Sequence, residues 1–259
     1  MAVDQVVWMD LGALILGGFL LTGSSNSFNQ IWERETDRMM DRTAMRPLPQ
    51  GRMQIIEALI AGTTAGIAGI AILWFVLNPL SGVLGTIALF SYVFLYTPLK
   101  PISSLSVFVG AFPGAIPPML GYVAGSGHFG LEPGLLFAVQ FMWQFPHFWA
   151  IAWVADDDYR KAGFFMLPFK EGRSKRSAFQ ILMYSVFLIP VSMLPWMLPA
   201  KQPMVGNIAM ITSVALGLWF VYLAYKLYQN LQIKDAKRLM FASFLYLPVV
   251  QLIYVIDKF

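Results

Sequence analysis

The sequence contains no cysteine among its 259 residues, which excludes disulfides, thiolate metal sites and the covalent attachment of a c-type haem. Charge is also scarce: 12% of the residues are charged, whereas soluble globular proteins carry about a quarter. The N-terminus has neither a basic segment nor a small-residue cleavage site, so we expect no secretory signal peptide. The shortage of charge argues against an ordinary soluble domain.

Long stretches without Asp, Glu, Lys or Arg lie between the few charged segments. A helix needs about 20 apolar residues to cross the hydrocarbon core of a bilayer. The stretch 58–99 is long enough for two helices, and Asn78-Pro79 supplies a turn between them. We therefore predict an all-α integral membrane protein, a polytopic bundle around an intramembrane cavity. Its eight expected spans lie near 6–28, 53–77, 81–97, 104–123, 133–154, 178–198, 206–226 and 239–256.

The basic residues fall almost entirely in alternate loops. Of the 18 Lys and Arg residues, only Lys201 and Lys258 lie in the opposite set of loops. The positive-inside rule therefore places the basic loops in the cytoplasm. We expect an inner-membrane protein with its N-terminus outside. The basic loops are 29–52, 98–103, 155–177 and 226–238.

The segment 29–47, NQIWERETDRMMDRTAMRP, concentrates acids and arginines at regular spacing. On a helix, a spacing of four residues places side chains along one stripe. One stripe would hold Asn29, Glu33, Asp37 and Asp41, and a neighbouring stripe would hold Arg34, Arg38, Arg42 and Arg46. Hard oxygen ligands beside arginines suit Mg²⁺ and phosphate. The alternative is a solvated helix with Glu–Arg pairs, each contributing only a few tenths of a kcal/mol.

A second acidic cluster follows the fifth expected span. It reads Asp156-Asp157-Asp158-Tyr159-Arg160-Lys161. Four expected spans separate the two charged loops, and an even number of crossings returns the chain to the same face. The two clusters therefore open on one side of the membrane, where they are suited to share metal ions around a diphosphate.

These motifs resemble those of the UbiA-type intramembrane prenyltransferases. Asn29-x-x-x-Glu33-Arg-x-x-Asp37, followed by Arg42-Thr-x-x-Arg46-Pro, is similar to the family's first signature, with Glu33 where many relatives have Asp. Four further motifs in the same order resemble the branch of the family that farnesylates haem. They are Tyr96-Thr-Pro-Leu-Lys100, Gly110-Ala-Phe-Pro-Gly-Ala-Ile-Pro-Pro118, Trp143-Gln-Phe-Pro-His147-Phe-Trp and Asp157-Asp-Tyr159-x-x-Ala-Gly163.

The resemblance implies one UbiA-like domain over residues 1–259. It also implies a bundle of nine helices, so we expect the family's first helix to be missing before this chain's first span. The implied reaction joins the farnesyl group of farnesyl diphosphate to a vinyl group of haem B, with Mg²⁺ as cofactor, and gives heme O for haem-copper oxidases. The expected partners are these two substrates, the lipid bilayer, and a haem A synthase or an oxidase-assembly protein; no nucleic acid is expected.

The resemblance also assigns roles to the residues of the two loops. As metal ligands and catalytic residues we expect Asn29, Glu33, Asp37 and Asp158, with Lys100 as a further catalytic residue. The expected substrate-binding residues, for the diphosphate or the haem propionates, are Arg38, Arg42, Arg46, Tyr96, His147, Asp157, Tyr159, Arg160 and Lys161.

Some features keep two interpretations. His147 suits haem placement or proton transfer, but also a hydrogen bond between helices. The aromatic residues between Phe141 and Trp153 suit an unreactive wall around an allylic cation, or ordinary membrane-helix packing. For the whole chain, the alternatives are another UbiA-type aromatic or chlorin prenyltransferase and, from a different class, a transporter or channel.

Overall fold

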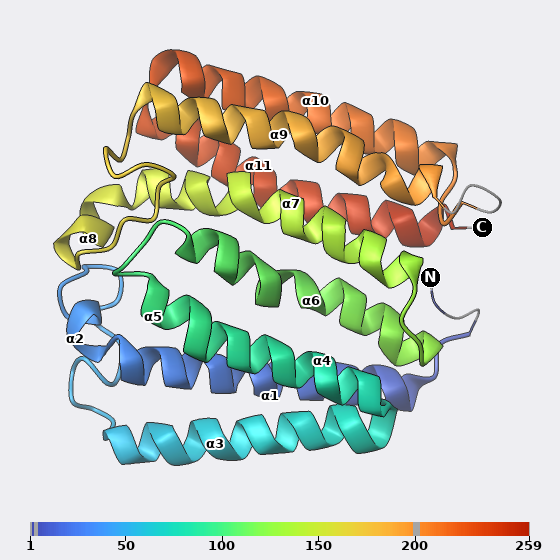
Figure 1. Ribbon diagram of the computed structural model, residues 1–259, viewed down its shortest axis with the longest axis horizontal. Coiled ribbons are helices and arrows are strands. Elements are labelled where there is room, and N and C mark those ends of the chain that lie inside the picture. The colour runs from blue at the N-terminus through green and yellow to red at the C-terminus, as the bar shows by residue number, and fades with distance from the viewer. Residues whose placement is uncertain (1, 3–4, 199–202, 259) are drawn as a thin grey trace. The chain divides into compact units, whose positions relative to one another are not determined.

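The computed structural model is helical throughout, with no β-strand in residues 2, 5–198 and 203–258, which are the residues that the structure describes (Figure 1). Two of the long helices continue as π-helical segments, which are Ile72–Leu77 and Ser91–Tyr96. The helices are α1 (Trp8–Trp32), α2 (Arg34–Asp37), α3 (Ile55–Ala71), α4 (Pro79–Phe90), α5 (Thr97–Leu99), α6 (Ser106–Ser126), α7 (Leu131–Val154), α8 (Asp156–Lys161), α9 (Lys175–Met197), α10 (Asn207–Asn230) and α11 (Ile233–Ile256).

The eight expected spans each correspond to a long helix. Seven of these helices, in the described part of the chain, are long and apolar enough to cross a membrane. The exception is α7, which has sufficient length but carries Gln140, Gln144 and His147 within its apolar sequence. The turn expected at Asn78-Pro79 is present: Pro79 begins α4, and the Asn78 side chain accepts a hydrogen bond from the Ser81 amide at 2.9 Å. Lys201, expected in an opposite loop, lies outside the described residues.

The outer surfaces of the helices are apolar, as a bilayer requires. Phe75 is 82% exposed, and Phe19 and Ile256 are similarly open. At most 39% of the apolar window of any of the seven spanning helices is buried. A water-soluble protein would bury such side chains, so their exposure agrees with the prediction of an integral membrane protein.

The chain divides into two compact units. The N-terminal unit comprises Ala2–His128 and Asp157–Phe165, and the C-terminal unit comprises mainly Phe129–Asp156 and Met166–Phe259. The N-terminal unit therefore includes the first charged loop and residues 157–165 of the second. The prediction of a single domain stays a prediction.

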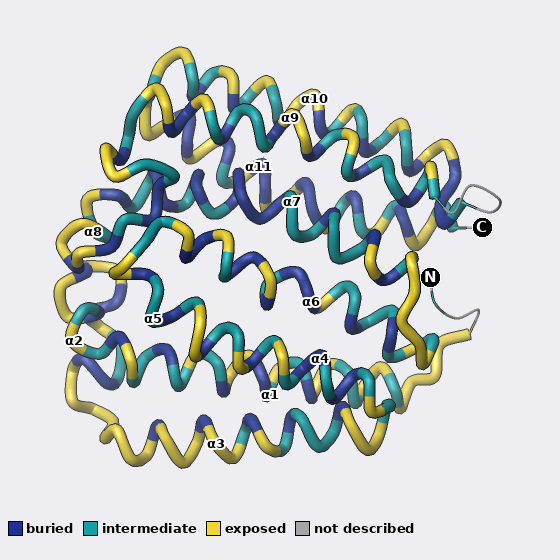
Figure 2. The backbone as a smooth tube through the Cα atoms, in the orientation of Figure 1, coloured by how far each residue is buried: buried dark blue, intermediate teal, exposed yellow. Residues whose placement is uncertain are grey.

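In the N-terminal unit, α1 packs along α3 and also contacts α4 and α6 (Figure 1). The buried positions of α3 are all small: Ala58, Gly62, Gly66 and Gly69, while the rest of its surface is largely exposed (Figure 2). A Cβ atom added at Gly69 would lie 3.0 Å from the Gly17 carbonyl oxygen. Small residues at this spacing allow the two backbones to approach closely.

In the C-terminal unit, α7 packs against α9 and α11, and α10 packs against the same two helices. Hydrogen bonds between helices join them: Trp143 Nε1 donates to the Ser243 carbonyl at 3.1 Å, and the Ser192 and Tyr246 hydroxyls lie 2.8 Å apart. Such bonds satisfy polar groups that hydrocarbon cannot solvate.

Candidate active site

The first charged loop begins with a break in the helix at Glu33. Helix α1 ends at Trp32, Glu33 has φ −94° and ψ 12°, and α2 resumes for one turn as Arg34–Asp37. The expected stripe at spacing four is therefore correct only as far as Asp37. Beyond that residue the chain turns repeatedly, so Asp41 and the later arginines do not continue a helical stripe.

Glu33 forms a buried ion pair with Lys100. The Lys100 Nζ atom lies 2.7 Å from Glu33 Oε1, and the two side chains are 11% and 7% exposed. Among the described residues, Glu33 Oε1 has no hydrogen-bond partner, so its contact with Lys100 is an ion pair. The Lys100 ammonium also lies 4.6 Å from the centre of the Tyr96 ring, a cation–π contact.

The segment that carries Tyr96 and Lys100 is positioned by the π-helical turn Ser91–Tyr96. Such turns occur often at functional sites, because they rotate the following residues relative to the regular helix. Directly after this turn, Thr97 Oγ1 accepts a hydrogen bond from Asn29 Nδ2 at 3.4 Å. Contacts in the structure thus link Glu33 to Lys100, Lys100 to Tyr96, and Asn29 to the adjacent Thr97.

Asp37 is fully buried and paired with an arginine. Arg46 NH1 donates to Asp37 Oδ2 at 2.8 Å, and the Thr43 hydroxyl donates to the Asp37 carbonyl at 3.0 Å. The second carboxylate oxygen of Asp37, Oδ1, is buried and has no hydrogen-bond partner in the described part of the chain. A buried anionic oxygen is costly when it has no partner, so it favours a ligand that supplies positive charge.

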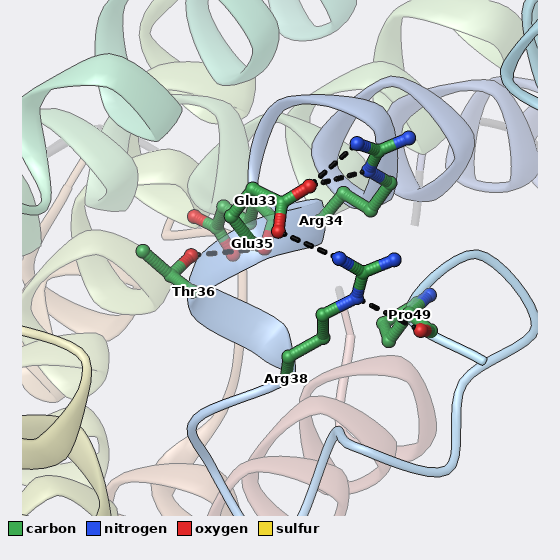
Figure 3. A network of polar contacts seen from close by, with 6 residues as sticks. All are labelled: Glu33, Arg34, Glu35, Thr36, Arg38 and Pro49. Carbon is green, nitrogen blue, oxygen red and sulfur yellow. Dashed lines mark hydrogen bonds and ion pairs between the residues drawn. The ribbon is translucent and has the colours of Figure 1, made fainter. Parts of the chain in front are cut away.

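The outer side of the loop holds a separate network around Glu35 (Figure 3). Arg34 Nε and Arg38 NH1 both donate to Glu35, each at 2.8 Å, and Arg38 Nε donates to the Pro49 carbonyl at 3.0 Å. The Arg34 hydrogen bond to this carboxylate lowers the pKa of Glu35. This network is the solvated Glu–Arg pairing that was the alternative for the whole stripe, and it includes Arg38, which was expected to bind substrate.

The second charged loop is bonded to the first through Asp158. Its carboxylate accepts hydrogen bonds from the backbone amides of Asp41 and Arg42, at 2.9 and 3.3 Å, and Lys161 Nζ lies 3.3 Å from Oδ1. Burial raises the pKa of Asp158, but these three donors outweigh it and hold that pKa below its ordinary value. Lys161 also pairs with Asp41 at 2.6 Å, and this hydrogen bond raises the pKa of Lys161.

Further residues of the two loops lie in the same region of the N-terminal unit. Arg42 NH2 donates to the Tyr159 hydroxyl at 3.4 Å, and its guanidinium lies 5.4 Å from the centre of that ring. Asp157 and Arg160 are exposed on α8, and Arg160 lies over the Phe165 ring at 6.0 Å. The geometry therefore joins Asp41, Arg42, Asp158, Tyr159 and Lys161 into one cluster.

His147 belongs to the C-terminal unit. Its Nδ1 lies 2.7 Å from the Ser243 hydroxyl of α11, and its ring stacks on Trp143 with the ring centres 4.2 Å apart. This contact is a hydrogen bond between helices, the alternative to a role of His147 in haem placement. Trp143, Phe145, Trp149 and Trp153 on the same helix are buried.

An apolar cavity of about 470 Å³ lies in the N-terminal unit, among α1, α4 and α6. Most of its lining is aliphatic, but Ser25, Asn26 and Tyr92 add polar groups. Ser25 and Asn26 precede Asn29 by about one turn of α1, so the cavity adjoins the segment that leads into the charged loop. Apolar cavities of this size with a few polar groups commonly bind small molecules.

The loops offer oxygen ligands for a magnesium ion. Within the described residues, no three His, Asp or Glu side chains converge closely enough to hold a metal ion. Mg²⁺ in proteins is, however, usually bound by one or two carboxylates, with waters and substrate phosphates completing its shell. The buried Asp37 Oδ1 fits that requirement, and Asn29 and Glu33 precede it along the chain at spacings of four residues.

Comparison with known proteins decides the family. The sequence matches the UbiA prenyltransferase family over residues 2–247. The chain belongs to the UbiA prenyltransferase family.

Several UbiA relatives share close to half of their residues with the chain. The protoheme IX farnesyltransferase of Cytophaga hutchinsonii is 48% identical over 98% of this chain and 87% of its own length. The protoheme IX farnesyltransferase of Christiangramia forsetii is 46% identical over 100% of this chain and 86% of its own length.

Solved structures share the fold at lower sequence identity. A digeranylgeranylglyceryl phosphate synthase superposes with a TM-score of 0.79 at 19% identity, covering 98% of this chain and 87% of the other. A UbiA homologue from Archaeoglobus fulgidus bound to DMAPP and Mg²⁺ gives a TM-score of 0.68 at 13% identity, covering 98% and 90%. These likenesses confirm the expected all-α UbiA fold.

Four residues of the candidate site were not predicted from sequence, and a fifth, Gly110, was expected only within a motif. Tyr92 lies one turn before Tyr96, and Ser25-Asn26 lies one turn before Asn29, so helical spacing from the known motifs points to them. Thr97 lies inside the Tyr96–Lys100 motif and was not singled out. Gly110 was expected only as part of a motif, yet a Cβ atom there would lie 2.6 Å from Tyr96 Cδ2, so its lack of a side chain accommodates that ring.

Proposed function

We propose that the chain transfers the farnesyl group of farnesyl diphosphate to a vinyl group of haem B, giving heme O. The observation that carries the proposal is the pair of buried carboxylates in the first charged loop, Glu33 beside Lys100 and Asp37 beside Arg46, in a UbiA-type chain whose relatives at 45–48% identity are named protoheme IX farnesyltransferases. The sites, the orientation in an inner membrane with the charged loops in the cytoplasm, and the use of Mg²⁺ are parts of the same proposal.

The cations of the two loops are proposed to bind the diphosphate. Arg42, Arg46, Lys100 and Lys161 each contact a carboxylate or a tyrosine of this region. When diphosphate enters, Arg46, Lys100 and Lys161 exchange a carboxylate partner for phosphate oxygens, and Arg42 exchanges the Tyr159 hydroxyl. Arginine contributes a planar pair of donors for this purpose, whereas lysine acts as a compact charge.

Asn29, Glu33 and Asp37 are the residues proposed to hold Mg²⁺, with Asp158 as a further candidate. When bound, Mg²⁺ neutralises the charge that develops on the diphosphate as the C1–O bond of the farnesyl group breaks. Asp158 already accepts two backbone amides and Lys161, so its first contribution is to hold the two loops together.

The farnesyl chain is proposed to occupy the apolar cavity among α1, α4 and α6. Among the described residues, its lining carries no Asp, Glu, His, Lys or Arg, so no carboxylate or amine is placed to react with an allylic cation. The ring of Tyr92 in this cavity presents a π-face, which stabilises a cation without reacting with it. Dryness of the cavity keeps water from competing with the haem vinyl group.

The proposal is tested with membranes that contain the chain, supplied with haem B, farnesyl diphosphate and Mg²⁺, with heme O measured by chromatography and mass spectrometry. Asp37→Asn removes the charge of the buried carboxylate and is expected to lower the rate at least about 100-fold, the usual effect of deleting one preorganised electrostatic contact. Chelation of the metal is expected to stop turnover.

Glu35→Gln is the matched control in the same assay. It removes an exposed charge on the same helical turn, while glutamine still accepts hydrogen bonds from Arg34 and Arg38. We expect it to keep at least half of the activity. Full activity of Asp37→Asn would contradict the site, and prenylation of 4-hydroxybenzoate in place of haem B would favour another UbiA-type reaction. Ion flux that depends on Glu33 without diphosphate release would favour a transporter.

A further inference from the structure

A basic pocket lies where α10 turns into α11, in the C-terminal unit. Its volume is about 270 Å³, and its lining includes Lys226 and Asn230 from α10 and Lys234, Asp235 and Arg238 from α11. None of these residues belongs to the candidate active site. The pocket therefore needs an explanation separate from prenyl transfer.

The carboxylate of the pocket is already satisfied by protein donors. Asp235 is 2% exposed, Asn230 Nδ2 donates to its Oδ2 at 2.9 Å, and Arg238 NH1 lies 3.5 Å from its Oδ1. Asp235 thus holds the turn together from the inside. It also orients Arg238 without removing that residue from the solvent, because the Arg238 side chain is 68% exposed.

The lysines of the pocket have no acidic partner. Among the described residues, neither Lys226 nor Lys234 forms an ion pair, and the one contact of the Lys226 ammonium is the Tyr222 ring at 5.5 Å. Three cations against one carboxylate give the pocket a formal charge of +2. A pocket with this excess favours an anion, and its open cations can donate hydrogen bonds to it.

The surrounding residues place the pocket at the level of the lipid headgroups. Tyr222 and Tyr225 on the last turns of α10 are exposed, as is usual for the aromatic belt at a membrane–water interface. One turn deeper, Trp219 on α10 and Phe241 on α11 are exposed apolar side chains. A lipid phosphate in the pocket would therefore have apolar helix surface beneath it for its acyl chains.

We propose that this pocket binds the phosphate of an anionic phospholipid. The loop belongs to the basic set that the positive-inside rule assigns to the cytoplasm, and the cytoplasmic leaflet is the anionic one. The volume is sufficient for a phosphate headgroup, while the acyl chains remain outside on α10 and α11. This inference does not depend on the proposed enzymatic reaction.

Lipid binding to the purified full chain is measured by native mass spectrometry in a mild detergent, with phosphatidylglycerol and phosphatidylcholine titrated separately. The Lys226→Gln/Lys234→Gln variant is expected to bind phosphatidylglycerol about 25-fold more weakly than the unaltered chain. This estimate assigns about fivefold to each lysine, because a cation near the membrane surface contributes about 1 kcal/mol to the attraction of anionic lipid. Phosphatidylcholine is expected to bind weakly to both.

Lys237→Gln is the matched control. Lys237 is an exposed cation on α11, the helix of Lys234, but it does not line the pocket. We expect it to keep its affinity within about twofold. In thermal unfolding, phosphatidylglycerol should raise the Tm of the unaltered chain and of Lys237→Gln, but not that of the double variant, since only a bound ligand stabilises the folded state.

Two results would overturn the proposal. One is equal binding of phosphatidylglycerol by the double variant and by Lys237→Gln, which would mean that the pocket lysines have no specific part in it. The other is displacement of the lipid by inorganic phosphate at micromolar concentration, which would assign the pocket to a soluble phosphate compound.

Discussion

Lys100 and Glu33 neutralise one another in a nearly buried position, which makes the pair sensitive to loss of either partner. Lys100→Met leaves the Glu33 carboxylate buried without a counter-charge. We expect destabilisation by about 3–5 kcal/mol, the usual effect of breaking a buried pair from one side. Thermal or denaturant unfolding in detergent measures it.

The double variant Lys100→Met/Glu33→Gln is the control for that measurement. It removes both charges together, so most of the lost stability should return, although heme O formation should not. Equal stability of Lys100→Met and the unaltered chain would contradict the role of Lys100 as the counter-charge of Glu33.

Gly110 is a second sensitive position, because the Tyr96 ring occupies the space that a side chain would need. Gly110→Ala forces that ring to move, and we expect a loss of about 1–3 kcal/mol, as for other overpacked sites. Gly121→Ala on the same helix is the matched control: its nearest atom would be 3.9 Å away, so no loss is expected. Equal Tm values for the two variants would contradict the close contact.

At the residue scale, the roles expected for the side chains of the charged loops stay predictions, and their partners in the structure were not predicted. Glu33 and Asp37 were expected to be metal ligands, yet each is paired with a cation in the structure. Lys100 contacts Glu33 from another loop, and no pattern in the sequence around either residue predicts such a contact. Arg46 meets Asp37 because the chain turns after Asp37, whereas continued helical spacing would have kept the two stripes apart.

Among the structural elements, α8 and the first charged loop are joined by hydrogen bonds to backbone amides. Asp158→Ala removes the acceptor for the amides of Asp41 and Arg42. We expect hydrogen exchange at these two amides to accelerate at least about tenfold, because a hydrogen bond to a charged group contributes about 1.5–3 kcal/mol. Exchange followed by mass spectrometry on peptides of residues 38–46 measures the change.

Glu35→Gln is the control in that experiment, since Glu35 lies in the same loop and contacts side chains only. Its peptides should exchange as in the unaltered chain. Unchanged exchange in Asp158→Ala would show that other contacts hold the two loops together.

The boundary between two helices was predicted correctly where the local sequence marks it. Asn78-Pro79 is such a signal, since asparagine caps a helix and proline suits its first turn. The break at Glu33 has no local signal, because Glu and Arg both favour helices. The packing of α1 on α3 through Gly62, Gly66 and Gly69 was not predicted either, although spacings of four and three place them on one face.

For the molecule as a whole, the lack of cysteine allows the orientation to be tested directly with single introduced thiols. His128 and Glu171 are exposed in loops that the sequence assigns to opposite faces. An impermeant maleimide should label the His128→Cys variant in intact cells, and the Glu171→Cys variant only in inverted vesicles. The reverse pattern would contradict the proposed orientation of the charged loops.

The hydrogen bonds from Asp41 and Arg42 to Asp158 join residues 117 and 116 positions apart in the chain. A ribosome adds about 5–20 residues per second, so roughly 6–23 s pass between synthesis of the first loop and synthesis of its partner. The Arg46–Asp37 pair joins residues only nine positions apart, so it can form early in that interval. The order of translation therefore gives the nascent first loop an internal counter-charge well before α8 emerges.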